Sequence, residues 1–563
     1  MRRLSFRKAA AAALLAPVLA GAPKLQAAPA PLSGQAYIHA AAAYKALERG
    51  DLPAAEREAH AARQLAPASP DAVRLLVDVL SRRGSKAGAL AVADQAIARG
   101  VRDGLLYAQR GYLRAEAEMS AAAMEDFRFA RAMPGTSAER ARELTLAIAN
   151  QAAMLKLPAE VVDILAPYAE ERSYAVAARR GFALFTLERH AEARAAFAAA
   201  TDAATSAEER RIAQKGLAQS AAALNDVPAV RDLVARISAG SDICDPDLIY
   251  LLLRIGDDRA AMDMADGPSC VGQIPAALHI DLGYAAKRLY SNREAVDRFT
   301  KGLDGYRTAA TALDPMMEFA LRREIDTLER EFGLVASVNS LLGRSREGGG
   351  DSIQFITEAF WQPRWFGFRN GTIAQLYARL SDNGPGIGTT QQGGKALEGT
   401  LGVRYKPLAE TNLVLAAERH FAFESQATDD WLLRAGYSGG HGLDISPVER
   451  SWTFEQHYAE VGYYTRQERT LMSGEARYGI SSKLADLDSL TGSLYVGGAV
   501  SYDSAERRTT SAGVGPGLSL RYWFRETSYR APASYVNLDL GYRLPLTPSD
   551  RVGGVYMQLY LSF

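Results

Sequence analysis

The chain has 563 residues, and its 65 Lys and Arg residues balance its 65 Asp and Glu residues. This length allows two or more domains, and the balanced charge gives no electrostatic basis for a nucleic-acid partner. The composition changes along the chain: all five Trp lie beyond residue 350, whereas Ala, Leu, Arg and Glu dominate before it. Because Ala, Leu, Arg and Glu favour helices and aromatic residues favour strands, we expect an α + β protein of two domains, with the helices first.

Residues 1–27 have the pattern of a secretory signal peptide. Basic residues at positions 2, 3, 7 and 8 precede a short apolar run over 9–22, and the small-residue exit Leu25-Gln26-Ala27 follows. We place the cleavage site after Ala27. No run of about 18 apolar residues follows it, which excludes a membrane-spanning helix. Any part of the mature chain that crosses a membrane must therefore consist of β-strands.

Residues 34–331 are expected to form a solenoid of tetratricopeptide-like helix pairs. Gly50 and Gly84 lie 34 residues apart, and the small residues Ala55, Ala89 and Ala123 follow the same step. Thirty-four residues is the period of the tetratricopeptide repeat, in which small side chains allow two helices to approach closely. The register becomes uncertain after about residue 200. Such pairs stack into a curved recognition scaffold, so this half is expected to bind partners and not to catalyse a reaction.

Aromatic residues of the helical half have two readings. They could line a glycan-binding groove, but at these spacings they more often pack between helices, which is the reading we favour. They are Tyr44, Tyr107, Tyr112, Phe182, Phe185, Tyr284 and Tyr290.

The two cysteines, Cys244 and Cys270, lie 26 residues apart and are flanked by turn-forming residues. In an exported protein such a pair predicts one structural disulfide. A loop of this size would stabilise the fold by about 3 kcal/mol in the chain-entropy model. A metal site needs more ligands than this pair offers, and a reactive thiol is the weaker alternative.

Residues 332–563 change to the period-two alternation of strands. Eleven segments show it clearly, and because single-chain bacterial barrels have even strand numbers, we take 332–343 as the twelfth. The fold class is therefore a tetratricopeptide-like α-solenoid followed by a 12-stranded antiparallel transmembrane β-barrel. The segments are 332–343, 352–362, 372–381, 396–407, 412–421, 431–437, 451–465, 470–480, 490–503, 510–524, 533–544 and 552–563.

The last strand ends the chain on Phe563. Val555, Met557 and Leu559 lie on one face, so a soluble sheet would finish on an open apolar edge, which invites aggregation. A closed membrane barrel has no such edge. Phe563 is accordingly predicted to be the carboxyl-terminal residue used in barrel assembly, and an ordinary edge strand is the alternative.

The other strands also have one apolar and one charged face. In a soluble barrel the charged face would be outside, and in a lipid-embedded barrel it lines the lumen. The signal peptide, Phe563 and the aromatic residues near strand ends favour lipid. The predicted lumen-lining residues are Glu358, Arg379, Glu398, Arg404, Glu418, Arg434, Glu460, Glu475, Arg477, Arg521, Asp539 and Arg543.

Interleaved Glu and Arg in a narrow lumen allow two states. The lining could hold a hydrated, largely neutral chain such as a polysaccharide, or its charges could pair and plug the barrel. The twelve-strand topology places the loops 344–351, 382–395, 424–430 and 544–551 outside the cell. It also leaves 438–450 as an unusually long periplasmic turn, for which the sequence gives no physical reason.

The strand half resembles the C-terminal domain of the NfrA-type bacteriophage adsorption protein A family. The resemblance covers about residues 355–563 and is carried by EAFWQPRWFGFRNGTIAQLYARL (358–380), GVRYKPLAETNLVLAAERHF (402–421), DDWLLRAGYS (430–438) and GPGLSLRYWFRETSY (515–529). It implies an outer-membrane barrel of a Gram-negative bacterium behind periplasmic repeats. It further implies pairing with an inner-membrane glycosyltransferase or polysaccharide synthase to export a surface polysaccharide, which bacteriophages adopt as receptor. The family has a longer periplasmic half than this chain.

Two functions follow as hypotheses. In the first, the solenoid receives a glycan chain or its synthase, and the barrel passes the chain outward. In the second, the barrel is a plugged anchor and the solenoid docks envelope proteins. Expected partners are outer-membrane lipid, the barrel-assembly machinery, the synthase, the glycan and bacteriophage, but not nucleic acid. No triad, phosphate loop or metal box is found in the sequence, so we expect no enzyme, no cofactor and no metal site.

Overall fold

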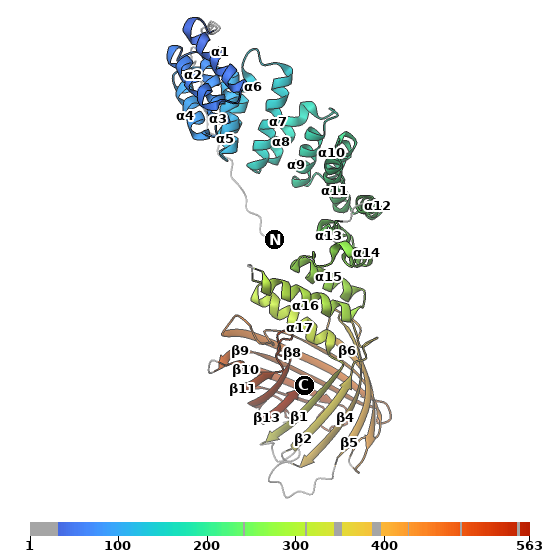
Figure 1. The fold of residues 1–563 in the computed structure, drawn as a ribbon. Helices are drawn as coiled ribbons and strands as arrows, with labels where there is room; N and C mark the ends of the chain where they lie inside the picture. Colours follow the sequence, from blue (N-terminus) through green and yellow to red (C-terminus); the bar gives the residue numbers. More distant parts are fainter. Residues whose placement is uncertain are drawn as a thin grey trace, which may run out of the picture. The chain divides into compact units, whose positions relative to one another are not determined.

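The computed structural model describes residues 32–239, 243–309, 312–342, 352–385, 396–425, 427–484, 487–548 and 552–563. The predicted signal peptide lies outside these residues. Over the described ranges the chain forms 17 α-helices followed by 13 strands (Figure 1). Twelve of the strands close into an antiparallel barrel, so the predicted fold class is confirmed. The chain divides into two compact units, Met1–Asp226 and Val227–Phe563, so the last helices belong with the barrel.

The first unit consists of antiparallel helix pairs joined by short turns. Its helices are α1 (Gly34–Glu48), α2 (Leu52–Leu65), α3 (Pro70–Arg82), α4 (Lys86–Ala98), α5 (Gly104–Glu116), α6 (Ser120–Ala132), α7 (Ala138–Met154), α8 (Pro158–Leu165), α9 (Tyr174–Thr186), α10 (His190–Ala203) and α11 (Ala207–Ala223), with a short 3-10 helix at Ala166–Tyr168.

A left-handed residue marks the turn inside each pair. Its φ is positive, and the next residue donates a backbone hydrogen bond five residues back, as from Ser85 to Leu80 (2.9 Å) and from Arg189 to Leu184 (2.9 Å). These residues are Gly50, Gly84, Glu118, Lys156, Glu188, Asn225, Gly256 and Tyr290. The first three keep the 34-residue step, but the next four follow at steps of 38, 32, 37 and 31 residues, which is why the repeat register fades along the sequence.

Small residues bring the paired helices together, as the repeat pattern predicts. A Cβ added at Gly111 would lie 2.7 Å from the ring of Phe127, and one at Gly181 would lie 2.8 Å from the ring of Phe197. Both phenylalanines are almost fully buried. The neighbouring aromatics Tyr112 and Phe182 pack edge-on against the same two rings. These aromatics therefore pack between helices, although both remain partly exposed.

The second unit begins with six helices. They are α12 (Val227–Ser238), α13 (Pro246–Arg254), α14 (Asp258–Ala265), α15 (Ala276–Arg288), α16 (Asn292–Thr308) and α17 (Pro315–Glu329), with a short 3-10 helix at Pro268–Cys270. Cys244 and Cys270 form a disulfide, with their Cα atoms 4.7 Å apart. This bond ties the segment before α13 to the segment after α14.

Two residues, 330 and 331, separate the end of α17 from the first strand. They are β1 (Phe332–Leu342), β2 (Ser352–Trp361), β3 (Phe368–Arg369), β4 (Thr372–Pro385), β5 (Glu398–Lys406), β6 (Leu413–Ala422), β7 (Trp431–His441), β8 (Ser451–Tyr464), β9 (Arg469–Leu484), β10 (Leu487–Asp503), β11 (Thr510–Phe524), β12 (Ser534–Pro545) and β13 (Gly554–Ser562).

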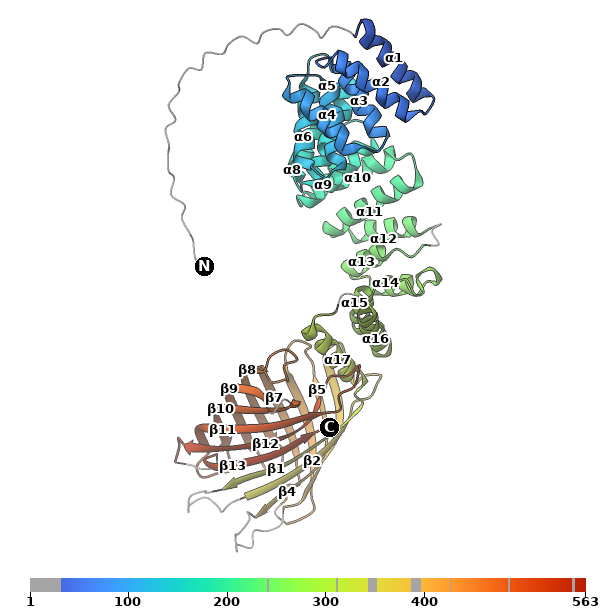
Figure 2. The same ribbon diagram turned by 60° about the vertical axis from the view of Figure 1, so that its left-hand side comes forward.

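Every barrel strand pairs antiparallel with its neighbours, and β13 closes the barrel on β1 (Figure 2). Val338 pairs with Leu559, and the backbone N–H of Phe563 donates to the carbonyl of Leu334 (2.9 Å). The short β3 pairs only with the first two residues of β4, and β2 pairs with the last ten residues of that strand. The segment 332–343, taken from the sequence as the twelfth strand, is confirmed as β1.

The two ends of the barrel differ. The helix-side end, where α17 leads into β1, carries the turns 362–371, 407–412, 442–450 and 525–533 and the carboxyl terminus. The opposite end carries 423–430, 465–468, 504–509 and the described part of 546–553. The predicted outer loops 344–351 and 382–395 lie largely outside the described residues.

Candidate functional site: the polar lumen of the barrel

The outward face of the barrel is apolar and exposed. Leu494 is 71% exposed and Leu401 is 57% exposed, whereas Glu418 is fully buried and Asp539 is 1% exposed. Exposed leucines beside buried carboxylates are the reverse of a water-soluble barrel. Together with barrel closure, this inversion indicates a lipid-facing exterior and a polar lumen.

Aromatic side chains lie at both ends of this apolar surface. Phe332, Trp361 and Trp365 pack in sequence near the helix-side end, with ring centroids 6.4 and 6.0 Å apart. Phe423 and Trp431 are exposed near the opposite end. Such belts are typical of the two membrane–water interfaces.

The predicted lumen residues form two ion-pair networks. In the first, a chain of pairs runs across six strands: Arg404 Nη1 to Glu358 (2.7 Å), Arg379 to Glu358 (3.0 Å) and Glu418 (3.2 Å), and Arg434 to Glu418 (2.5 Å) and Glu460 (3.0 Å). Glu398 joins this network through His420, whose ring nitrogens lie 2.5 Å from Glu398 and 3.1 Å from Glu418.

The second network lies on β9, β10, β12 and β13. Arg477 pairs with both Glu475 and Asp539, and Arg543 Nη2 lies 3.0 Å from Glu475 Oε1. Tyr495 donates to Asp539, and its hydroxyl lies 2.7 Å from that of Tyr556. Opposite charges therefore neutralise one another over most of the lining.

Arg521 is the predicted lumen residue that joins neither network. Its Nε donates to Asn537 Oδ1 (3.1 Å) and its Nη1 donates to the carbonyl of Leu443 (3.1 Å). Among the described residues no carboxylate lies within 4 Å of it. Its guanidinium lies over the rings of Trp523 and Tyr535, at 5.1 and 4.5 Å from their centroids.

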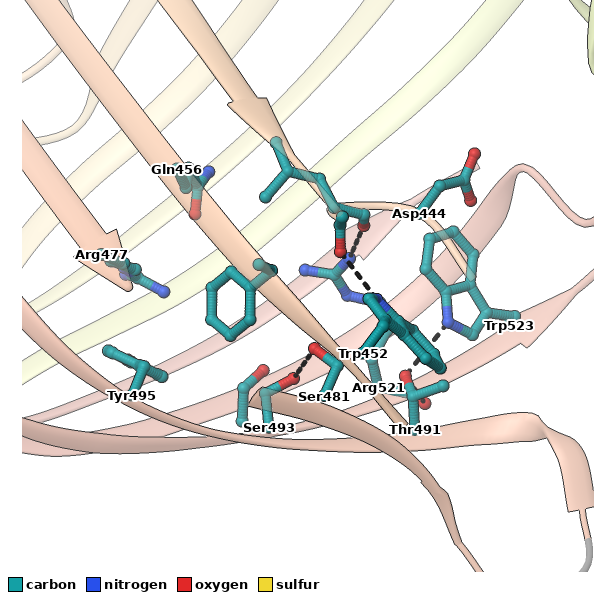
Figure 3. A pocket seen from close by; sticks show the side chains of 14 residues that line it. Asp444, Trp452, Gln456, Arg477, Ser481, Thr491, Ser493, Tyr495, Arg521 and Trp523 are labelled. Atoms are coloured by element: carbon teal, nitrogen blue, oxygen red, sulfur yellow. Dashed lines mark hydrogen bonds between the residues drawn. The ribbon is translucent and has the colours of Figure 1, made fainter. Parts of the chain in front are cut away.

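A cavity opens beside Arg521 inside the helix-side end of the barrel (Figure 3). Its wall combines hydroxyl, amide and aromatic groups, including Ser481, Ser493, Thr491, Gln456, Trp452 and Trp523. Several of these groups are fixed by their neighbours: Trp523 Nε1 donates to Thr491 Oγ1 (3.2 Å), and the hydroxyls of Ser481 and Ser493 lie 2.8 Å apart.

The long 442–450 turn forms one side of this cavity. Leu443 and Asp444 line it, and Trp452 Nε1 donates to the carbonyl of Gly442 (2.9 Å). Ile445 is buried. The turn therefore folds inward over the lumen, which explains its unusual length.

Helix α17 binds this turn and also the 525–533 turn. Arg323 pairs with Asp444, with Nε to Oδ2 at 2.8 Å, and lies over the Trp523 ring at 5.5 Å. Arg322 Nη2 donates to the carboxylate of Glu526 (2.7 Å) and to the carbonyl of Arg530 (3.0 Å) in the 525–533 turn.

Helix α16 adds a third anchor. Tyr529 donates to Asp304 Oδ1 (2.8 Å), and this hydrogen bond raises the pKa of Tyr529. The helix-side end of the barrel is thus covered by α16, α17 and the turns that they bind.

Sequence reasoning missed the role of the 442–450 turn, of Trp523 and of Thr491. Its one signal was the length of the 438–450 segment. In the part of the chain that the structure describes, no helix is long and apolar enough to cross a membrane, and no cluster of three or more His, Cys, Asp or Glu residues could hold a metal ion.

Comparisons with known proteins address the two halves separately. No curated protein sequence matches the chain significantly. The solved structures that resemble it include a tetratricopeptide repeat protein from Parabacteroides merdae, 18% identical over 49% of this chain and 95% of its own, with a TM-score of 0.24. PilF of Pseudomonas aeruginosa is 15% identical over 40% of this chain and 97% of its own, with a TM-score of 0.30. The type IV pilus biogenesis factor PilW is 15% identical over 39% of this chain and 100% of its own, with a TM-score of 0.31.

The strand half matches a family profile described as the bacteriophage N adsorption protein A C-terminal region, NfrA_C, over residues 389–559. This range runs from nine residues before β5 to Leu559 inside β13 and includes most of the lumen wall described above. The barrel and this match together indicate the outer membrane. The resemblance seen in the sequence is therefore confirmed, and residues 389–559 are similar to the bacteriophage N adsorption protein A C-terminal region.

Proposed function

We propose that this protein is the outer-membrane component of a surface-polysaccharide export system. The observation that carries the proposal is the lumen wall, where ion pairs, hydroxyls and aromatic rings line a path inside an apolar exterior. Hydroxyl and amide groups exchange hydrogen bonds with sugar hydroxyls, and aromatic faces offer stacking surfaces. Such a wall suits a hydrated glycan chain better than an apolar solute.

In this proposal the helix pairs lie in the periplasm and receive the glycan or its inner-membrane glycosyltransferase. Elongation by that enzyme supplies the motive force. Phe563 serves recognition by the barrel-assembly machinery, and the loops opposite the helices face the medium, where bacteriophages attach. Catalysis is assigned to the partner and not to this chain.

Deletion of the gene tests the proposal. We expect loss of one surface polysaccharide from the deletion strain and its return when the wild-type gene is supplied in trans. A complete and unchanged glycan profile in the deletion strain would contradict export.

A second function is favoured by the paired charges and the covered helix-side end. In it the barrel is a plugged outer-membrane anchor, and the helices are a docking platform for envelope proteins. Single-channel recordings separate the two, because a plugged barrel stays silent even when the outer loops, such as 424–430, are shortened. Stepwise conductance that glycan fragments block would favour export.

A further inference from the structure

The luminal arginines fall into two groups. Five of them bind carboxylates in the networks described above: Arg379, Arg404, Arg434, Arg477 and Arg543. Arg521 is half-buried and, within the described ranges, has no carboxylate within 4 Å. Its Nη2 donates no hydrogen bond to any described residue, so one edge of its guanidinium is free.

The carboxylates that act on Arg521 from farther away belong to other arginines. Asp444 is bound by Arg323, and Asp539 is bound by Arg477. A partly desolvated cation without a counter-charge is unfavourable, and an arriving anion removes that cost. Nη2 and the second N–H of Nη1 form the planar fork through which a carboxylate can bind by two parallel hydrogen bonds.

The surroundings of Arg521 suit a sugar. Trp523 and Tyr535 hold its guanidinium by cation–π contacts, and Asn537 and the Leu443 carbonyl fix its orientation. Ser493, Gln456 and Trp452 line the same cavity, as Figure 3 shows, and offer hydroxyl, amide and aromatic groups. The cavity measures about 40 Å³, which is room for a carboxylate group but not for a whole sugar ring. A bare inorganic anion would contact only the arginine, whereas a sugar acid would add contacts of its hydroxyls at the edge of the cavity.

We infer that this cavity is a subsite for an acidic sugar unit, whose carboxylate enters it to bind Arg521 while its ring stays in the open lumen and its hydroxyls meet the Gln456 and Ser493 side of the wall. This inference rests on the proposed export function, and it names the substrate class: a polysaccharide that contains uronic acid, in place of the largely neutral chain expected from the sequence. The subsite lies where a chain enters from the helix-side end.

Binding of defined oligosaccharides to the full chain in lipid nanodiscs tests the subsite. The probes are tetragalacturonate, neutral maltotetraose and inorganic phosphate, followed by calorimetry and by the fluorescence of the tryptophans. We expect tetragalacturonate to bind more tightly than maltotetraose by about tenfold or more, the effect of one charge-assisted contact, and to weaken as salt is added. Phosphate is expected to bind more weakly than tetragalacturonate.

Variants sharpen the test. We expect Arg521→Gln to weaken tetragalacturonate binding by roughly 10- to 100-fold and to leave maltotetraose binding unchanged. Arg521→Lys keeps the charge but loses the fork, so it should fall between the two. The matched control is Arg466→Gln, which removes an exposed arginine from the 465–468 turn at the opposite end of the barrel.

Equal affinity for the acidic and neutral probes would overturn the inference. So would phosphate binding as tight as that of tetragalacturonate, or unaltered tetragalacturonate binding by folded Arg521→Gln. If that variant does not fold, as judged by its heat-modifiable gel mobility, the preference and salt dependence of the wild-type protein decide.

Failure of the subsite and failure of export are distinguishable. A glycan profile unchanged by gene deletion, together with tetragalacturonate preference in the purified protein, removes export and keeps the site. Loss of a polysaccharide on deletion, without that preference, keeps export and removes the site.

Discussion

Tyrosines in the lumen lie flat against glycines of the neighbouring strand. At Gly517 an added Cβ would lie 2.6 Å from the hydroxyl of Tyr495, its partner in the β10–β11 register. Glycine at this point lets the ring cover the backbone of the next strand, as aromatic rings do over glycines in designed sheets. The three pairs are Tyr377 with Gly402, Tyr495 with Gly517, and Tyr556 with Gly541.

Gly517→Ala is expected to displace Tyr495 from its bonds to Asp539 and Tyr556 and to destabilise the barrel by about 1–3 kcal/mol. The measurement is the urea unfolding midpoint in detergent micelles. Gly498→Ala is the control, because its Cβ would meet nothing closer than a carbonyl oxygen at 3.8 Å. Equal midpoints for the two variants would contradict this role of Gly517.

Asp430 joins two loops at the end opposite the helices. Its fully buried carboxylate accepts hydrogen bonds from the backbone N–H of Trp431 (2.6 Å), Arg466 (2.9 Å) and Gln467 (2.9 Å). Burial alone would raise the pKa of Asp430, but these N–H groups outweigh it, so the pKa lies below its ordinary value of 3.8. The carboxylate therefore stabilises the fold above pH 3.8, and this stability is lost as the pH falls through the lower, folded-state value.

Asp430→Asn is expected to lower the free energy of unfolding by about 1–3 kcal/mol at pH 7, because a neutral amide replaces the carboxylate that accepts hydrogen bonds from several backbone N–H groups. Unfolding midpoints of the two proteins at pH 7 and at pH 3 measure this cost. The difference between wild type and variant should shrink at the lower pH. A difference that stays constant would show that the charge of Asp430 is not the cause.

At the scale of elements, the 442–450 turn and α17 together narrow the helix-side end of the barrel. The turn reaches the Arg521 cavity through Leu443, and α17 holds the turn through the Arg323–Asp444 pair. Asp444 is partly exposed, so the pair contributes only about 0.2–1 kcal/mol. A contact of this strength suits an element that moves aside for a passing chain.

Breaking that pair is expected to open the lumen without unfolding the barrel. Asp444→Arg or Arg323→Glu should raise the open-to-closed ratio in single-channel recordings by up to about fivefold, the equivalent of 1 kcal/mol. The double charge exchange, Arg323→Glu with Asp444→Arg, should return the ratio toward that of wild type. Silent channels in all three variants would favour the plugged anchor, and an unrestored double variant would argue against the pair as a latch.

Element boundaries followed closely from the sequence in the strand half. The alternation of two chemically distinct faces shows both ends of a strand, as at β11, expected and found over residues 510–524. In the helical half the register was lost because the spacing of the turns departs from 34 residues and because Lys156 and Glu188 take the left-handed position that Gly50 and Gly84 hold earlier. Glycine favours this conformation and so marks the turn in a sequence, whereas Lys and Glu do not.

The candidate site was only partly predictable. Period-two parity assigns Glu418, Arg434 and Arg521 to one face, but it does not tell which of them meet. Pairing depends on strand register and on how far each guanidinium reaches around the barrel, and neither is a local property. The inward fold of the 442–450 turn and the unpaired state of Arg521 therefore required the structure.

The whole barrel combines an apolar exterior with a polar path inside it. Leu494 and Gln456 lie on opposite sides of that wall: the leucine is on the exposed apolar face, and the glutamine lines the luminal cavity. The two positions allow a direct comparison of lipid face and lumen within one protein.

Photo-crosslinking in living cells tests whether a glycan passes through this lumen. Benzoylphenylalanine is placed at position 456 or at position 494, the cells are irradiated during polysaccharide synthesis, and the purified protein is probed for attached glycan. We expect a glycan adduct from position 456 and none from position 494. Adducts from neither position, or equally from both, would contradict passage of a glycan through this lumen.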